Sequence, residues 1–264
     1  MRRTSSPDNT IDLSAISGLP MRLESRDLSL TFGEGLNQPE REIRRLEDIR
    51  PMLWQPDASG PEHLYSVYMG IGRAEDDSAI RSQGLVYGSM IFSPGLVGDE
   101  PIRSQGHLHA FAPGGLRYSE VFQFWTGEGY LYLQKEVGPD VTRALFVRVS
   151  PGDIVVLPGD WMHLVVNVGS EPLSFGAWAA RDNQFEYGQL RALGGPAYFV
   201  MADGEIAPNP RYRSVAPVEI ADPRDIPTLG IPADRPIYET WQADPHMLDF
   251  VADPELARVS WQTL

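Results

Sequence analysis

Between residues 64 and 179 the chain consists mostly of short β-branched and aromatic runs, and this rhythm constrains the fold more than any other feature. Most of the runs are separated by clusters of Gly, Pro, Asp or Ser, the residues that favour turns. The runs span residues 64–71, 84–92, 119–125, 129–134, 144–150, 153–158, 163–168 and 173–179. Such a pattern is typical of antiparallel strands in a sandwich or barrel, so we expect an all-β fold.

The segment before these runs has a different pattern. Residues 40–50 read EREIRRLEDIR and place Ile43, Leu46 and Ile49 three residues apart. Residues at this spacing lie on one face of a helix, so the segment predicts a short helix ahead of the barrel.

The last part of the chain is rich in proline. Residues 208–264 contain nine prolines, and Asp-Pro pairs occur at 222–223, 244–245 and 253–254. Proline cannot donate to a strand ladder, so central strands are excluded here. We expect an extended arm with brief turns that packs on the barrel or on a partner subunit, with Trp241, Phe250 and Trp261 as apolar anchors. The chain then divides into an N-terminal arm (residues 1–39), a barrel domain (40–207) and a C-terminal extension (208–264).

Charge and cysteine content exclude several classes of partner and site. The 264 residues carry a formal net charge of −14, which disfavours nucleic acid and anionic membranes as partners. The absence of cysteine excludes disulfides and thiolate sites, so any metal ligands are His, Asp, Glu or backbone oxygen. No apolar segment follows the arginines near the start, and no run of 18 apolar residues occurs. We therefore expect a cytoplasmic protein.

Histidines are few and unevenly placed. Of the five, His107 and His109 lie one residue apart in RSQGHLH, where a strand would direct both side chains to the same face. Glu120 begins the next run, so a hairpin would bring its carboxylate opposite the pair, and His163 stands at the entry of a later run. A single buried histidine is usually a hydrogen-bonded core residue, and His-x-His alone is a weak signal.

The spacing of the surrounding residues strengthens the metal hypothesis. Gly127 follows Glu120 by seven residues, and Gly152, Pro158 and His163 form a second block. Together the two blocks resemble the two motifs of the cupin superfamily, in which the first supplies His, His and Glu and the second a last His. This resemblance implies a cupin jelly-roll β-barrel with a metal held by His107, His109, Glu120 and His163. Three nitrogens and one carboxylate suit one divalent first-row ion, namely Fe2+, Mn2+, Zn2+ or Ni2+.

A longer resemblance covers residues 40–213. SPGLVGDE ahead of GHLH, WMH in the second block, and the later YG and NPRY make the chain similar to cupin-type glucose-6-phosphate isomerase, known from archaea and some bacteria. The resemblance implies a homodimer that binds a small sugar phosphate and interconverts glucose 6-phosphate and fructose 6-phosphate through an enediolate. Glu120 would be the general base, and Tyr187 matches the family tyrosine of the late YG. The phosphate-holding region of the family matches Tyr87, Ser89, Ser104 and Gly106, with Tyr65 or Tyr68 as further candidates.

Departures from the family pattern concern the substrate. Gln105 stands where the family often has a lysine, Phe122 where it commonly has tyrosine, and Phe185 where members can carry a histidine suited to ring opening. The loop between His109 and Glu120 is four residues longer than usual and contains Arg117, which is either a replacement for the missing phosphate charge or a solvated loop arginine. Another phosphosugar or an unphosphorylated aldose therefore stays open as substrate. An iron oxygenase and a non-catalytic, metal-containing sugar-binding cupin are the alternative functions.

Overall fold

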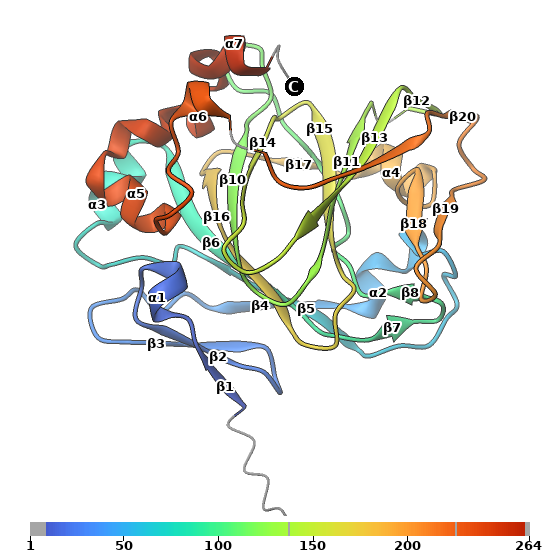
Figure 1. Cartoon of the computed structure of the whole chain (residues 1–264), viewed down its shortest axis with the longest axis horizontal. Coiled ribbons are helices and arrows are strands. Elements are labelled where there is room, and N and C mark those ends of the chain that lie inside the picture. The colour runs from blue at the N-terminus through green and yellow to red at the C-terminus, as the bar shows by residue number, and fades with distance from the viewer. Residues whose placement is uncertain (1–8, 137, 225, 262–264) are drawn as a thin grey trace, which may run out of the picture.

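Two sheets packed face to face form the centre of the computed structural model, which describes residues 9–136, 138–224 and 226–261 (Figure 1). All of their strand pairs are antiparallel except the parallel pair β13–β21 at the edge of the smaller sheet. The six-stranded sheet has the order β14-β10-β16-β6-β5-β4 and the four-stranded sheet the order β15-β11-β13-β21. Their bounds are β4 Arg41–Arg45, β5 His63–Met69, β6 Leu85–Phe92, β10 Glu120–Thr126, β11 Gly129–Lys135, β13 Arg143–Val149, β14 Ile154–Leu157, β15 Trp161–Asn167, β16 Leu173–Ala180 and β21 Val218–Ala221. Every one of the eight apolar runs is a strand, so the predicted all-β cupin jelly-roll barrel is confirmed.

Strand alternation separates the barrel interior from the outer faces of the sheets. In β10, Phe122 and Phe124 point inward and pack with Phe175 of β16. Val121 and Trp125, the alternate residues, belong to a separate core on the outer face. Glu120 lies on the inward face with Phe122, so the start of β10 directs a carboxylate into the barrel.

Short elements close the barrel and cover the outer face of the four-stranded sheet. This face packs Tyr132, Phe146 and Leu164 against side chains from residues 190–215. The elements here and at the rims are β7 Leu96–Val97, β8 Glu100–Pro101, β9 Leu108–His109, β12 Asp140–Val141, β17 Phe185–Glu186, α4 Gly188–Ala192, β18 Tyr198–Val200, β19 Ile206–Pro208 and β20 Ser214–Val215. The helix α3 Asp77–Ser82 lies on the other side, where its Ile80 belongs to the core over the outer face of the six-stranded sheet.

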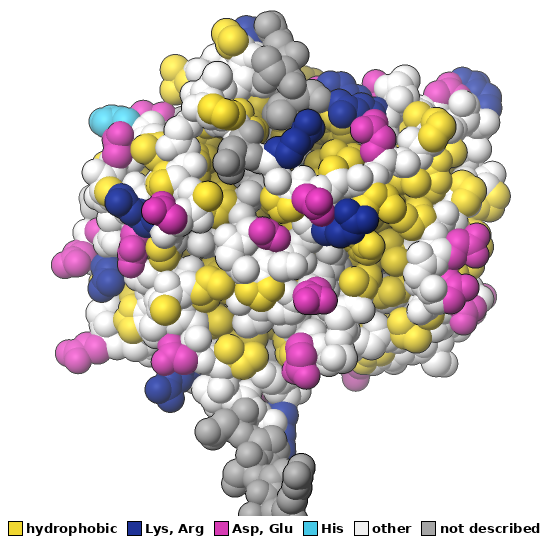
Figure 2. All heavy atoms as spheres, in the orientation of Figure 1, with side chains coloured by type: hydrophobic (Ala, Val, Ile, Leu, Met, Phe, Trp, Pro, Cys, Tyr) yellow, Lys and Arg dark blue, Asp and Glu magenta, His cyan; other side chains and the backbone are white. Residues whose placement is uncertain are grey.

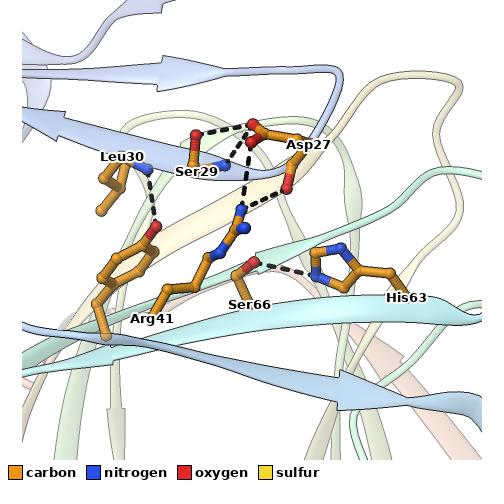
Figure 3. A network of polar contacts seen from close by, with 7 residues as sticks. Asp27, Ser29, Leu30, Arg41, His63 and Ser66 are labelled. Atoms are coloured by element: carbon orange, nitrogen blue, oxygen red, sulfur yellow. Dashed lines mark hydrogen bonds and ion pairs between the residues drawn. The ribbon is translucent and has the colours of Figure 1, made fainter.

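The two ends of the chain together cover the outer face of the six-stranded sheet. The N-terminal part forms a three-stranded sheet and a helical turn: β1 Thr10–Asp12, α1 Ser14–Ser17, β2 Met21–Glu24 and β3 Ser29–Phe32. Two polar contacts attach it to the barrel (Figure 3). Arg41 of β4 donates to the Asp27 carbonyl at 2.8 Å, and the Leu30 N–H donates to the Tyr68 hydroxyl at 3.0 Å. Nearby, the ring of His63 lies 3.1 Å from the Ser66 hydroxyl.

The C-terminal extension packs beside this small sheet. Trp178 of β16 donates from Nε1 to the Ile237 carbonyl at 3.0 Å, and the Ile237 N–H donates to Gln123 Oε1 at 3.0 Å. Trp241 and Phe250 are buried, and Trp261 packs edge-on against Phe250. These contacts join the extension to the barrel of its own chain.

Within the extension, the expected extended arm is wrong for residues 227–261, which contain successive short helices (Figure 1). They are η2 Pro227–Leu229, α5 Ile237–Ala243, η3 Pro245–Leu248, α6 Asp249–Ala252, η4 Pro254–Ala257 and α7 Arg258–Trp261. Two of the Asp-Pro pairs start 3-10 helices, because Asp244 accepts from the His246 N–H and Asp253 from the Glu255 N–H. Central strands are absent from the described part of the extension, as predicted, and β21 lies at a sheet edge.

The helix predicted over residues 40–50 is correct only for its second half. Arg41–Arg45 form β4, paired antiparallel with β5, and the helical part comprises α2 Leu46–Ile49 and η1 Arg50–Met52. The Arg45 N–H donates to Asp48 at 2.7 Å and caps the helix at the point where the strand ends. Pairing with β5 therefore overrides the helical spacing of Ile43. Within the described residues, no helix has the length and apolarity to span a membrane.

Candidate metal centre

Three histidines and one glutamate converge inside one end of the barrel. His107 precedes and His109 ends β9, Glu120 begins β10, and His163 lies in β15. Their potential ligand atoms all lie within 4.8 Å of one another. His107 Nε2 is 3.2 Å from His109 Nε2, and Glu120 Oε2 is 3.4 Å from His163 Nε2 and 3.5 Å from His109 Nε2.

Backbone pairing places the two histidine segments against each other. The His107 N–H donates to the His163 carbonyl at 3.2 Å, and the His163 N–H returns a bond to the His107 carbonyl at 3.1 Å. Gly106, directly before His107, has a φ of +79°, a conformation that glycine adopts without strain. This turn lets the chain approach β15 closely and directs His107 into the barrel.

In two of the three histidines the second ring nitrogen is fixed by a backbone carbonyl. His109 Nδ1 lies 2.7 Å from the Tyr118 carbonyl and His163 Nδ1 lies 3.3 Å from the Trp161 carbonyl. Because a carbonyl only accepts, each Nδ1 carries the proton and each Nε2 presents a lone pair to the centre. The Nε2 of His163 is buried and has no hydrogen bond among the described residues, as expected of an atom that serves as a ligand.

Protonation states also suit a cation. Burial lowers the pKa of His107 well below its ordinary value and also lowers that of His163, so both rings are neutral near pH 7. Burial alone would raise the pKa of Glu120, and the ring nitrogens of His109 and His163 that face it lower that pKa below the usual range when they carry a proton. Neutral imidazoles and an ionised carboxylate are the forms that metals require. Three nitrogens and one oxygen at these separations fit one divalent first-row ion, since ligands on opposite sides of such an ion lie about 4 Å apart.

A pocket runs from this centre along the inner face of the six-stranded sheet. Its walls are largely apolar and include Met69, Met90 and Phe175. Phe185 of β17 covers the centre, because its ring centroid lies 4.1 Å from that of His107 while 43% of the residue is exposed to solvent. Among the polar residues, Glu42, Arg44, Tyr65 and Tyr187 also line the pocket.

The comparisons with known proteins agree with this site. The family model described as "Glucose-6-phosphate isomerase (GPI)" matches residues 44–216. Curated proteins called glucose-6-phosphate isomerase are 31% identical over 203 residues in Pyrococcus abyssi and 31% over 182 residues in Pyrococcus furiosus. These alignments cover 74% and 66% of this chain and 100% and 89% of the relatives. The relative from Thermococcus litoralis is 27% identical over 195 residues, covering 70% of this chain and 95% of its own.

The chain belongs to the cupin-type glucose-6-phosphate isomerase family. All four residues of the metal centre lie inside the matched range. The small sheet β1–β3 and the helices α5–α7 lie outside the range that the family model matches.

Some of the residues expected from the isomerase family line the pocket. Tyr187, directly before α4, is a lining residue whose ring centroid lies 6.1 Å from that of His107. Tyr65, Ser104 and Gly106 also line it. The Ser104 hydroxyl accepts a bond from the Val165 N–H at 3.0 Å, so backbone already occupies part of its capacity.

Tyr87 does not lie in the pocket, against expectation. Its side chain is fully buried in the outer core between Trp178 and Tyr238, because alternation along β6 directs residue 87 outward. Ser89, two residues later, has the same parity, which directs its hydroxyl outward while its backbone reaches the pocket lining. Tyr68 likewise faces outward, and its hydroxyl accepts a hydrogen bond from the Leu30 N–H.

Arg117 is also outside the pocket. Its guanidinium donates to the His109 carbonyl, pairs with Glu186 at 3.1 Å and stacks over Phe111. It therefore joins the long loop to β9 and β17, and the expectation that it supplies the phosphate charge does not fit this placement.

The sequence did not reveal Arg44, a positively charged residue that lines the pocket. Arg44 and Glu42 point inward from β4 and form an ion pair at 2.8 Å. Both residues lie in the segment that was predicted to be a helix, and a helix would not direct residues two apart to the same face. In a strand, their spacing of two residues directs both to the same face.

Proposed function

We propose that this protein is a metal-dependent aldose–ketose isomerase that interconverts glucose 6-phosphate and fructose 6-phosphate through an enediolate. The observation that carries the proposal is the convergence of three imidazoles and a carboxylate at one end of a pocket, in a chain of this isomerase family. A divalent ion held by His107, His109, Glu120 and His163 would stabilise, as a Lewis acid, the negative charge that develops on the sugar oxygens.

Glu120 is proposed as the general base that moves the proton between C2 and C1. Burial raises its pKa, whereas protons on the facing imidazoles or a bound cation lower it, so Glu120 would be a carboxylate in the loaded site and able to accept a proton. Tyr187 is proposed as the hydrogen-bond donor to the sugar, because burial raises its pKa and its hydroxyl keeps its proton. Phe185 and the apolar walls would exclude water from the reacting carbons.

The phosphate end of the substrate is assigned to the pocket beyond the metal centre. Arg44 supplies a guanidinium there, Tyr65 a hydroxyl, and the backbone near Ser104 and Gly106 can supply amides. We further propose, on the family resemblance, a cytoplasmic homodimer. Light scattering of the purified protein tests the dimer.

Turnover with defined metal content tests the isomerase. Protein loaded with Mn2+ or Fe2+ should form fructose 6-phosphate from glucose 6-phosphate at the same rate with and without O2. His163→Ala should lose both bound metal and turnover, whereas His246→Ala should keep both, because that side chain is 82% exposed and outside the pocket. Absence of product from metal-replete protein, in an assay that detects slow enzymes, would exclude this substrate.

Two further measurements separate the alternatives. Exchange of solvent deuterium into C1 or C2 of the sugar supports proton transfer through Glu120, whereas full retention of the substrate hydrogen indicates a hydride shift. Oxygen uptake coupled to product would favour an oxygenase. Sugar binding without turnover or exchange would favour a binding protein.

A further inference from the structure

Two charged side chains face each other inside the substrate pocket on the edge strand β4. Glu42 and Arg44 both line the pocket, and Glu42 Oε1 lies 2.8 Å from an Arg44 guanidinium nitrogen. Their side chains are 56% and 35% exposed, so the pair is accessible from the pocket and from solvent.

The pair dominates the charge of the pocket away from the metal centre. Among the described lining residues, Arg44 is the one arginine or lysine, and Glu42 is the one carboxylate besides Glu120. The net charge of −14 gives the molecule no long-range attraction for anions, and acidic side chains are scattered over the face seen in Figure 2. The local balance between Glu42 and Arg44 therefore decides how this region receives an anion.

We propose that Glu42 is a specificity-determining residue that weakens the binding of phosphorylated sugars by competing with phosphate for Arg44. The inference rests on the proposed sugar isomerase and concerns its choice of substrate. A phosphate binds a guanidinium best through two parallel N–H donors, and Glu42 already engages one of these nitrogens. A bound phosphate must displace or share this carboxylate and also meets its repulsion, whereas an uncharged hydroxymethyl group meets neither.

Replacing the carboxylate of Glu42 by an uncharged amide tests the proposal directly. Glu42→Gln keeps the size of the side chain and removes its charge. Glu62→Gln is the matched control: it removes the partner of Arg45, the neighbour of Arg44, and makes the same change in net charge outside the pocket. Both glutamates are exposed, so both variants should fold, and circular dichroism verifies this.

The probes are sorbitol 6-phosphate and sorbitol, which cannot react because they have no carbonyl group. Calorimetry on the metal-loaded full chain should show sorbitol 6-phosphate binding about three- to tenfold more tightly to Glu42→Gln than to wild type at low salt. Sorbitol affinity should be unchanged, Glu62→Gln should match wild type, and the gain should shrink as salt rises.

Several outcomes would overturn the proposal. These are an unchanged sorbitol 6-phosphate affinity in Glu42→Gln, an equal gain for both probes, or no binding of sorbitol 6-phosphate by either protein. Because the probes bind without reacting, failure of the proposal for Glu42 can be distinguished from failure of the isomerase proposal. If Glu42→Gln shows the expected change in affinity but the protein turns over no sugar phosphate, the isomerase proposal is refuted and the proposed role of Glu42 stands.

Discussion

Replacing Gly106 by alanine should damage both the stability and the metal centre of this protein. Gly106 has a φ of +79°, and a Cβ there would lie 3.2 Å from Leu164 Cδ2 and 3.3 Å from Leu164 Cβ. Alanine in this left-handed conformation costs about 1–2 kcal/mol. Because a chain of this size unfolds with an entropy of about 0.55 kcal/mol/K, the midpoint of thermal unfolding should fall by about 2–4 °C.

The same substitution should weaken metal binding. Gly106 precedes His107, and Leu164 follows His163, so the added methyl group presses on the two segments that carry these ligands. Their mutual backbone bonds, 3.2 and 3.1 Å long, transmit any shift from one histidine to the other. We expect metal affinity to fall about tenfold or more, as when the supports of metal ligands are changed elsewhere.

Gly35→Ala is the control for backbone strain alone. Gly35 has a φ of +80°, and its added Cβ would meet nothing within 4 Å. Urea unfolding should show similar losses of stability for both variants, and titration with Mn2+ should show lost affinity for Gly106→Ala only. Equal metal affinity in the two variants would refute the positioning role of Gly106.

Three further predictions concern the metal, a buried tyrosine and the C-terminal extension. Chelation should lower the unfolding midpoint by about 5 °C relative to protein with metal at 100 times its Kd, and calorimetry showing no change would contradict a metal bound only by the folded state. Burial raises the pKa of Tyr212 to about 12, so the folded state keeps a proton that the unfolded state loses near pH 10. This stability is present below pH 10 and is lost between pH 10 and 12, and in urea unfolding Tyr212→Phe should remove about 2–3 kcal/mol of the alkaline loss. Trp178→Phe leaves the Ile237 carbonyl without its donor and should cost about 1–3 kcal/mol, with faster proteolysis near α5 than in wild type.

The barrel and the cluster of three histidines and Glu120 could be predicted because both depend on local periodicity. Each apolar run is short and bounded by turn residues, so it fits a buried strand better than a helix. The grouping of His107 with His109 follows from their spacing, and their encounter with His163 follows from the motifs of the cupin barrel. Their measured proximity agrees with that reasoning.

The missed features depend on contacts distant in sequence. The spacing of Ile43, Leu46 and Ile49 is helical, yet residues 41–45 gain more by pairing with β5. That error also hid Arg44 and Glu42, because only a strand directs both into the pocket. Tyr87 was assigned by its position in a family motif, which does not reveal that its face of β6 is covered by residues near Tyr238, outside the range shared with the family.

The C-terminal extension contacts the strand that carries Glu120. Ser119, directly before Glu120, donates its hydroxyl to the carbonyl of Phe250 at 3.0 Å, and Phe250 is itself buried in the outer core. Gln123, three residues beyond Glu120, accepts from Ile237. The extension therefore contacts β10 on both sides of Glu120, although none of the four clustered residues comes from it. Because a metal ligand must be held within about 0.5 Å of its productive position, we expect these two contacts to support the placement of Glu120.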